Sequence, residues 1–161
     1  MITQPAKHLA IFIHKLSGGG APRRVLTLVH AFAERGHRVD LVVVSAEGPL
    51  LEQVRPEIRL VVLDSEMPRL IRRLKKQRLR TIASTGKLAR YLRREKPDVL
   101  LSGANHVNLT ALWARRLARV PVPLVLRASN HLSGSNRNPI NRRYFRWWMA
   151  RRIYCLSLIH I

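Results

Sequence analysis

The sequence predicts an α/β domain in which helices cover both faces of a doubly wound parallel sheet, so that the chain forms three α/β/α layers. Short β-branched runs alternate with longer segments of helical periodicity, and this alternation is typical of βαβ units. The run LVVV at residues 41–44 is apolar at every position, as a strand buried on both faces of a parallel sheet must be. With 161 residues, the chain has the length of one domain with a substantial core.

The individual elements follow from local patterns. We expect strands at residues 8–13, 38–45, 58–63, 98–101 and 122–127. The first helix, at residues 22–35, is the best defined, because Pro22 suits its first turn and Gly36 ends it. Its apolar residues recur at helical spacing and are expected to face the sheet: Val25, Leu28, Val29 and Phe32. A further helix is expected at residues 108–118, and a polar loop at 129–143.

The chain has a strong excess of positive charge. It has 30 Lys or Arg against 9 Asp or Glu, a formal net charge of +21, yet 47% of its residues are hydrophobic, which indicates a folded domain with anionic partners. The lone cysteine, Cys155, cannot form an internal disulfide, and the N-terminus does not resemble a secretory signal, so a reducing cytosol is expected. No run approaches the roughly 18 apolar residues of a membrane span, so any membrane contact is expected to be peripheral.

A glycine turn, SGGGAPRR at residues 17–24, joins the first strand to the first helix. Such a turn suits a phosphate, because the first helical N–H groups are unpaired and the helix dipole is positive there. Two arginines, Arg23 and Arg24, oppose this dipole unless an anion lies beside them. The alternative is that the glycines only make a tight turn.

Two kinds of nucleotide site are disfavoured at this turn. It lacks the Gly-Lys-Ser/Thr of a nucleoside-triphosphate loop, and Arg23 stands where a dinucleotide site needs its third glycine. No acid ends the second strand to hold a ribose, because Asp40 comes too early and Glu47 too late. An NAD-type oxidoreductase domain is therefore disfavoured as well.

Four segments of the chain form a recognisable pattern when they are taken together. They are GGAPRRVLTL at 19–28, FAERGHRVDLVVV at 32–44, KPDVLLSG at 96–103 and VPLVLRASN at 122–130. Together they resemble the N-terminal part of family 4 glycosyltransferases of the GT-B fold, whose GGAERVVLNL type of pattern aligns with the first segment without gaps. Pro22 replaces the usual glutamate and Arg24 an apolar residue. The resemblance implies a Rossmann-like, acceptor-side domain at residues 1–155, with the nucleotide-sugar held largely by a C-terminal donor-binding domain that is absent here.

The resemblance also implies a function. A retaining glycosyltransferase of this kind moves a sugar from a nucleotide-sugar donor to a lipid-linked or polysaccharide acceptor, and this domain is expected to be inactive by itself. In the family the glycine turn helps to accommodate the donor diphosphate or the acceptor, which carries over to Gly19, Gly20 and Arg23. No cofactor is expected here, since the nucleotide-sugar is a substrate. The absence of metal spacing, a nucleophile elbow or a close carboxylate pair suits chemistry by positioning and phosphate stabilisation.

Polar residues after the later strands complete the predicted site. Family members often place a histidine or a polar pair after the fifth strand, and Arg127, Asn130 and His131 occupy that region. We interpret His131 as the catalytic residue, since a neutral imidazole can hydrogen-bond a sugar or a phosphate; the alternative is a solvated loop histidine. His106, beside Asn105, is a further binding candidate, unless the pair only caps the helix that follows.

A basic row is expected on a helix that follows the third strand. Five cations recur at intervals of three and four on one face, opposite apolar residues: Arg69, Arg72, Arg73, Lys76 and Arg80. A solvated surface is one interpretation, but cations with no acid between them repel one another and favour an anionic partner. Nucleic acid is disfavoured, because Tyr91 is the only aromatic residue between positions 69 and 96. We favour an anionic membrane, which predicts a cytoplasmic protein peripheral to the inner membrane.

Two alternatives stay open. One is a stand-alone basic module that binds RNA or an anionic membrane. The other concerns the end of the chain, where LSLIHI at 156–161 resembles one reading frame of a transposon-end adaptor used in sequencing libraries. We expect these six residues to be a non-native tail on a truncated gene, whereas the alternative is a native strand, IYCLSLIHI.

Overall fold

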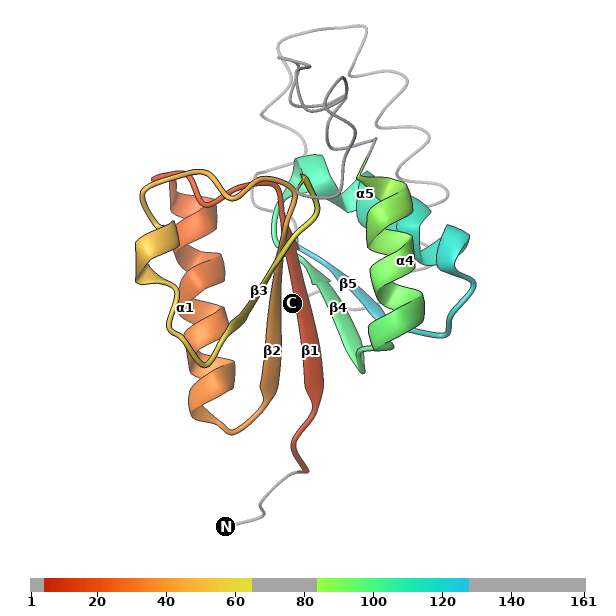
Figure 1. Cartoon of the computed structure of the whole chain (residues 1–161), viewed down its shortest axis with the longest axis horizontal. Coiled ribbons are helices and arrows are strands. Elements are labelled where there is room, and N and C mark those ends of the chain that lie inside the picture. Colours follow the sequence, from red (N-terminus) through yellow and green to blue (C-terminus); the bar gives the residue numbers. More distant parts are fainter. Residues whose placement is uncertain (1–4, 65–83, 128–161) are drawn as a thin grey trace, which may run out of the picture. The chain divides into compact units, whose positions relative to one another are not determined.

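The computed structural model describes residues 5–64 and 84–127, which contain a five-stranded parallel sheet in the order β3-β2-β1-β4-β5 (Figure 1). The strands are β1 (His8–Ile13), β2 (Arg38–Val43), β3 (Arg59–Val62), β4 (Val99–Ser102) and β5 (Leu124–Leu126). β1 lies at the centre and pairs with β2 and β4, so the order of the strands reverses beside it. The five predicted strands are confirmed.

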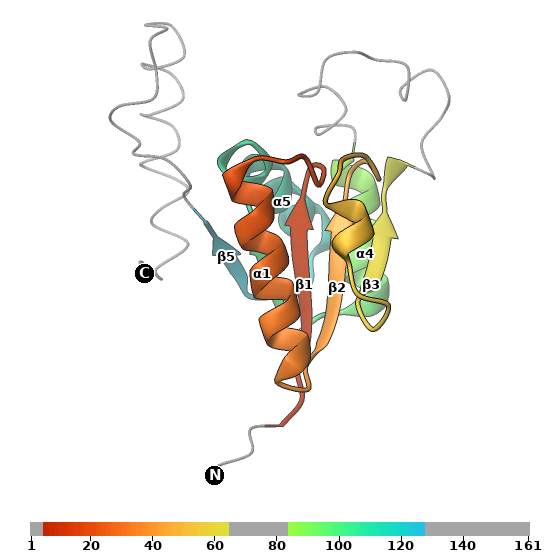
Figure 2. The same cartoon turned by 90° about the vertical axis from the view of Figure 1, so that its left-hand side faces the viewer.

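Helices cover both faces of this sheet (Figures 1 and 2). α1 (Gly20–Glu34) and the short η1 (Leu51–Gln53) lie on one face, and α4 (Thr85–Glu95) and α5 (Asn105–Ala118) lie on the other. The predicted three-layer α/β/α arrangement is therefore confirmed.

The sheet separates two apolar cores because side chains of a strand alternate between its faces. In β1, Ile11 and Ile13 pack toward Val25 and Val29 of α1. Ala10 and Phe12, on the other face of the same strand, pack with the residues of α4 and α5. All four β1 residues are at most 1% exposed, which explains why the central strands are apolar without interruption.

α1 is confirmed, but the set of its residues that face the sheet differs in part from the predicted one. The helix begins at Gly20 rather than Pro22, and Gly36 adopts a φ of +79°, the left-handed conformation that ends helices. Val25 and Val29 are buried as predicted, but Leu26 is buried where Leu28 was expected. The buried stripe runs through i, i+3, i+4 and i+7 from Pro22, because these positions face the sheet once the helix is seated.

None of the helices within residues 5–64 and 84–127 is long and apolar enough to cross a membrane.

Candidate functional site

The candidate site lies at the carboxyl edge of the sheet, beside β1 and β4. These strands are neighbours, but the chain leaves β1 toward α1 on one face and leaves β4 toward α5 on the other. In open parallel sheets, ligands bind where the direction of the connections reverses in this way. The arrowhead of β1 and the start of α1 meet at this edge (Figure 2).

The described part of the chain leaves room for a side chain at each of the three glycines of the turn. Among the described residues, the glycines with positive φ are Gly36 and Gly48, so the turn itself needs no left-handed residue. A Cβ on Gly20 would meet nothing within 4 Å, and one on Gly19 would meet only Pro22, at 3.9 Å. The described residues thus set no steric demand for glycine at positions 19 and 20, and the open backbone leaves room for a ligand.

The first turn of α1 presents unpaired donors and positive charge. Gly19 is the N-cap, with no side-chain cap, and the turn carries no acid. The amide of Arg23 donates to the carbonyl of Gly19 at 3.3 Å, whereas in the described part of the chain the amides of Gly20 and Ala21 have no acceptor. Arg23 and Arg24 are both exposed. An anion at this position is therefore favoured by the free amides, by the helix dipole and by the two guanidinium groups.

The loop after β2 holds the turn in place, which sequence reasoning missed. The amide of Leu16 donates to the carbonyl of Glu47 at 3.1 Å, and the amide of Leu50 donates to the carbonyl of Leu16 at 3.3 Å. Gly48 lies between them with a φ of +121°, and a Cβ there would overlap the carbonyl of Leu16. Lys15 reaches Glu47 across the same contact, at 4.0 Å. Position 48 thus requires glycine, because the backbone there passes too close to the backbone of Leu16 for a side chain to fit.

Gly103 fixes the distance between β4 and α1. Its amide donates to the carbonyl of Phe12 at 2.8 Å, and a Cβ there would lie 2.7 Å from Cγ2 of Val25. α1 therefore packs directly over the end of β4. The helix that follows, α5, has Ala104 as its N-cap, so neither Asn105 nor His106 is the capping residue.

A buried hydrogen-bond chain positions Arg127 at the end of β5. The Ser102 hydroxyl donates to Oδ1 of Asn108 at 2.6 Å, and Nδ2 of Asn108 donates to the carbonyl of Arg127 at 3.3 Å. The amide of Arg127 donates back to the carbonyl of Ser102 at 3.1 Å. Nη1 of Arg127 is buried and has no hydrogen-bond partner among the described residues. The signal that could have revealed this hydrogen-bond chain was Asn108, a polar residue one position after the apolar Val107 on the buried side of α5.

The predicted site residues fall into two groups. Those that the structure describes all lie in the loops or first helical turns that follow strands β1, β4 and β5: Gly19, Gly20, Arg23, His106 and Arg127. Asn130, His131 and the basic row at 69–80 lie outside the described residues. Within the described residues, no group of three or more His, Cys, Asp or Glu could hold a metal ion.

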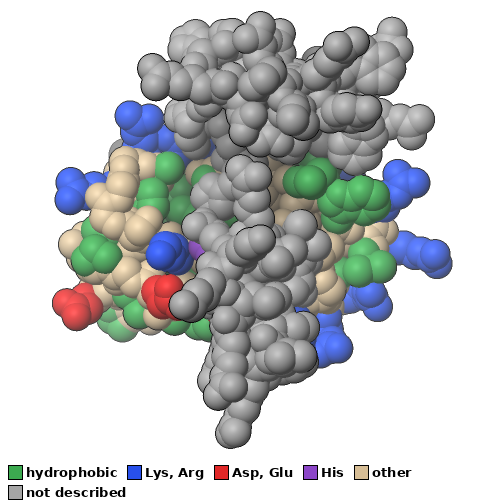
Figure 3. Space-filling view, turned by 90° about the horizontal axis from the view of Figure 1, so that it is seen from above, with side chains coloured by type: hydrophobic (Ala, Val, Ile, Leu, Met, Phe, Trp, Pro, Cys, Tyr) green, Lys and Arg blue, Asp and Glu red, His purple; other side chains and the backbone are tan. Residues whose placement is uncertain are grey.

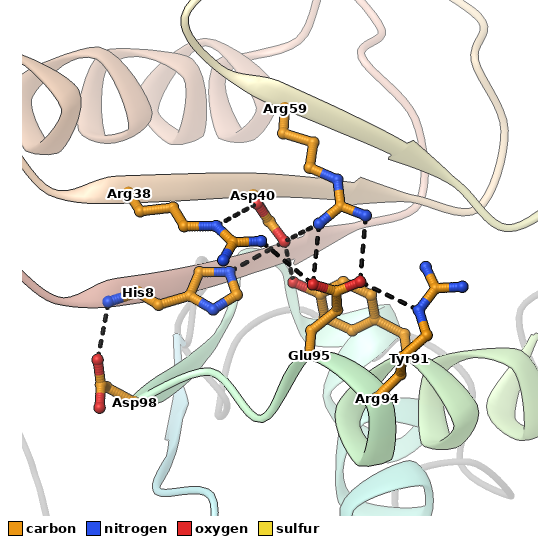
Figure 4. A network of polar contacts seen from close by, with 8 residues as sticks. All are labelled: His8, Arg38, Asp40, Arg59, Tyr91, Arg94, Glu95 and Asp98. Atoms are coloured by element: carbon orange, nitrogen blue, oxygen red, sulfur yellow. Dashed lines mark hydrogen bonds and ion pairs between the residues drawn. The ribbon is translucent and has the colours of Figure 1, made fainter.

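A second polar cluster lies at the opposite edge of the sheet, and sequence reasoning missed it (Figure 4). Its members are His8, Arg38, Asp40, Arg59, Tyr91, Arg94, Glu95 and Asp98. The buried Asp40 carboxylate accepts a 2.6 Å hydrogen bond from the Tyr91 phenol and lies 3.0 Å from Nε2 of His8. Glu95 accepts hydrogen bonds from Arg59 at 2.9 and 3.1 Å. The cluster joins the end of α4 to the start of β1, β2 and β3.

The cluster shifts the pKa values of Glu95 and Tyr91. The hydrogen bonds from Arg59 lower the pKa of Glu95 to about 2, with a further contribution from Arg94. Burial and the hydrogen bond to Asp40 raise the pKa of the Tyr91 phenol well above its ordinary value of 10. Asp40 is thus engaged within the protein, which agrees with the interpretation that it holds no ribose.

The sheet order and the glycine turn at the reversal define a Rossmann-like α/β domain. Comparison of sequences then gives the family. The model described as Glycosyltransferase Family 4 matches residues 18–158, and the chain belongs to this family. Among curated proteins, no sequence gives a significant match.

Solved structures share the fold. MurG of Acinetobacter baumannii matches with a TM-score of 0.54 and 18% identity, over 80% of this chain and 36% of MurG. The chain thus spans little more than a third of MurG, and at this identity the likeness shows the fold alone. The C-terminal domain of a hydrogenase from Pyrococcus furiosus gives a TM-score of 0.44 and 18% identity, over 75% of this chain and 90% of that one, a likeness too weak to inform function.

Proposed function

We propose that this chain is the acceptor-side domain of a retaining glycosyltransferase, which transfers a sugar from a nucleotide-sugar donor to a lipid-linked or polysaccharide acceptor. The family supplies the reaction class. The glycine turn supplies the observation that carries the proposal. Its glycines are exposed and sterically free, and they lead into the amides of Gly20 and Ala21, which have no acceptor among the described residues. A ligand that approaches the backbone closely is what such a turn accommodates.

The roles of the residues follow from charge. When the glycosidic bond of the donor breaks, negative charge develops on the leaving diphosphate. In this proposal the amides of Gly20 and Ala21 and the guanidinium of Arg23 stabilise that charge, or hold an anionic acceptor in line with it. Further donors are proposed from the segments that follow β5 and β4. They are Arg127, whose buried Nη1 has no hydrogen-bond partner among the described residues, and His106.

The remaining parts of the proposal concern residues outside the described ranges. His131 and Asn130 are proposed to face the acceptor, with His131 as the catalytic residue. A second domain, encoded after about residue 155, is proposed to hold most of the nucleotide-sugar, which leaves this domain inactive alone. Sequencing of the intact locus tests this second domain, because a native stop codon directly after Ile161 would contradict it.

The proposed location is the cytoplasmic face of an anionic membrane, where a lipid-linked acceptor is reached. The net charge of +21 supports this partner. Nucleic acid is the less favourable partner for the basic region, because Tyr91 is 4% exposed and its phenol donates to Asp40. It therefore has no free face on which a base could stack.

The substitution Gly20→Ala in the full-length enzyme tests the glycine turn. The added methyl group meets nothing within 4 Å, and alanine favours a helix over glycine by up to about 1 kcal/mol, so the melting temperature should hold or rise. If a ligand contacts this backbone, kcat/KM should fall by about tenfold or more, since each 1.4 kcal/mol is tenfold in rate.

Gly86→Ala is the matched control. Gly86 also lies in the first turn of a helix, α4, and a Cβ there also meets nothing within 4 Å. It should leave kcat/KM unchanged. Equal activity of the Gly20→Ala and Gly86→Ala enzymes would return the turn to a purely structural role.

A further inference from the structure

The outward face of α5 carries large apolar side chains. Trp113 and Leu117, one helical turn apart, are 49% and 52% exposed, and in the described part of the chain they are the large hydrophobic residues that are exposed. Leu109, a turn before Trp113, is half-buried on the same face. About half of the surface of this tryptophan therefore lies in water.

The inner face of α5 explains why this arrangement is unusual. The residues that pack against the sheet and α4 are mostly small: Val107, Ala111, Ala114 and Ala118. α5 is therefore apolar on two opposite faces, with small side chains inside and bulky ones outside. Because the inner face of α5 already packs in the core, bulky apolar side chains on its outer face mark a surface for another partner.

Positive charge surrounds this apolar pair. Nη2 of Arg93, on α4, donates to the carbonyl of Leu117 at 3.4 Å, which places this arginine beside the pair. Arg116 and Arg119 are exposed on α5. Residues 85–95 and 105–119 together contain seven Lys or Arg and one acid, Glu95, which is ion-paired with Arg59 and Arg94. On the α4–α5 side of the molecule, hydrophobic side chains are bordered by Lys and Arg (right-hand side of Figure 3).

We propose that this α4–α5 surface docks on an anionic lipid bilayer, with Trp113 and Leu117 in the boundary between headgroups and acyl chains and Arg93, Arg116 and Arg119 against lipid phosphates. Tryptophan is enriched at this boundary, and basic residues beside it bind anionic lipid. Two exposed side chains are too few for the core of a stable protein interface. The surface consists of described residues, and none of them belongs to the basic row at 69–80.

Docking by this surface would also bring the candidate site near the lipid. α5 begins at Asn105, at the carboxyl edge of the sheet, and Trp113 lies about 12 Å further along the helix axis, at 1.5 Å per residue. A lipid-linked acceptor would then reach the edge that carries the glycine turn. This last consequence rests on the proposed function, whereas the docking itself does not require glycosyl transfer.

Tryptophan fluorescence provides a direct test on the full chain. The chain has three tryptophans, so Trp147→Phe with Trp148→Phe leaves Trp113 as the reporter. Vesicles of phosphatidylglycerol and phosphatidylcholine should shift its emission to the blue, and brominated acyl chains should quench it. Pure phosphatidylcholine vesicles should have little effect. Vesicle binding without quenching of Trp113 would overturn the proposal, as would a blue shift that depends on protein concentration without lipid, which would indicate a second copy.

Paired variants separate the contributions of apolar contact and charge. Trp113→Ser with Leu117→Ser, and Arg93→Ser with Arg116→Ser, should each lower the vesicle partition coefficient by about tenfold or more. The control pair, Arg24→Ser with Arg35→Ser, removes the same charge from exposed positions at α1. It should lower the vesicle partition coefficient much less. An equal loss in the control pair would mean that net charge alone binds the membrane, and would overturn the docking surface.

A separate variant measures the contribution of the basic row at 69–80 to membrane binding. Arg72→Glu with Arg73→Glu tests whether that row contributes to membrane binding, as the proposed function holds. If this variant loses binding while the Trp113 and Leu117 pair does not, the α4–α5 surface is wrong and the row stands. If the reverse holds, the α4–α5 surface stands alone. If the unmodified chain binds RNA but not anionic vesicles at matched salt, both membrane assignments fall.

Discussion

The phenol of Tyr91 donates a 2.6 Å hydrogen bond to the carboxylate of Asp40, 51 positions earlier in the chain. Tyr91 belongs to α4 and Asp40 to β2, so the bond joins the outer layer of the domain to its sheet. Asp40 is 0% exposed, and a buried carboxyl group without hydrogen-bond partners is costly. The tyrosine is thus a structural partner of a buried polar group, and this gives a first prediction.

Tyr91→Phe should destabilise the domain, because it leaves a buried carboxylate without one of its donors. The expected loss in the free energy of unfolding is about 1 to 3 kcal/mol. Urea denaturation followed by circular dichroism measures it. Because the pKa of Tyr91 is raised in the folded state, the stability that it contributes is present below pH 10 and falls as the pH rises above that value. The Tyr91→Phe variant should lack this alkaline loss, and an unchanged alkaline profile would contradict the assignment.

Glu95 should make the domain sensitive to acid. Its pKa is lowered from 4.5 to about 2, chiefly by the hydrogen bonds from Arg59, so its contribution is present above pH 4.5 and is lost as the pH falls toward 2. Glu95→Gln should reduce the stability at pH 6 more than at pH 3, which thermal unfolding at both values measures. Glu57→Gln is the control, since Glu57 is 51% exposed and lies 3.9 Å from Arg55. Equal effects of the two substitutions at both pH values would refute the role of Glu95.

Gly103→Ala should strain the contact between α1 and β4. The added Cβ would lie 2.7 Å from Cγ2 of Val25, and overpacking of this kind costs about 1 to 3 kcal/mol. A double-mutant cycle with Val25→Ala tests the mechanism, because the smaller residue makes room for the methyl group. The two changes together should cost less than the sum of the single changes. Strict additivity would show that the strain lies elsewhere.

Arg23→Ala in the full-length enzyme should weaken catalysis without destabilising the fold. Arg23 is exposed, and exposed substitutions usually change stability by less than about 0.5 kcal/mol. Steady-state kinetics should show kcat/KM lowered by about tenfold or more if its guanidinium faces the donor phosphate or the acceptor. Arg24→Ala removes the same charge from the neighbouring position and should have a smaller effect. Identical losses would indicate a general field of positive charge rather than a contact of Arg23.

The order of the elements was predictable because it depends on local patterns. β-branched runs, the helical spacing of Val25 and Val29 and the glycine at position 36 are each set by residues close in sequence, and each was confirmed. The glycine turn was likewise visible as a candidate anion site. The sequence could not show that a side chain would fit at Gly19 and Gly20, because this depends on which atoms of distant segments surround them.

The sequence by itself determined the α/β class, the family resemblance and the edge of the sheet where the candidate residues lie. Only the tertiary structure decided that Gly48 and Gly103 allow backbones and layers to touch, that Tyr91 and Glu95 bond across the domain, and that Trp113 faces solvent. The physical reason is the parallel sheet itself. Parallel neighbours cannot be joined by a tight hairpin, so the contacts that fix burial and charge join residues that lie far apart along the chain and leave no local pattern.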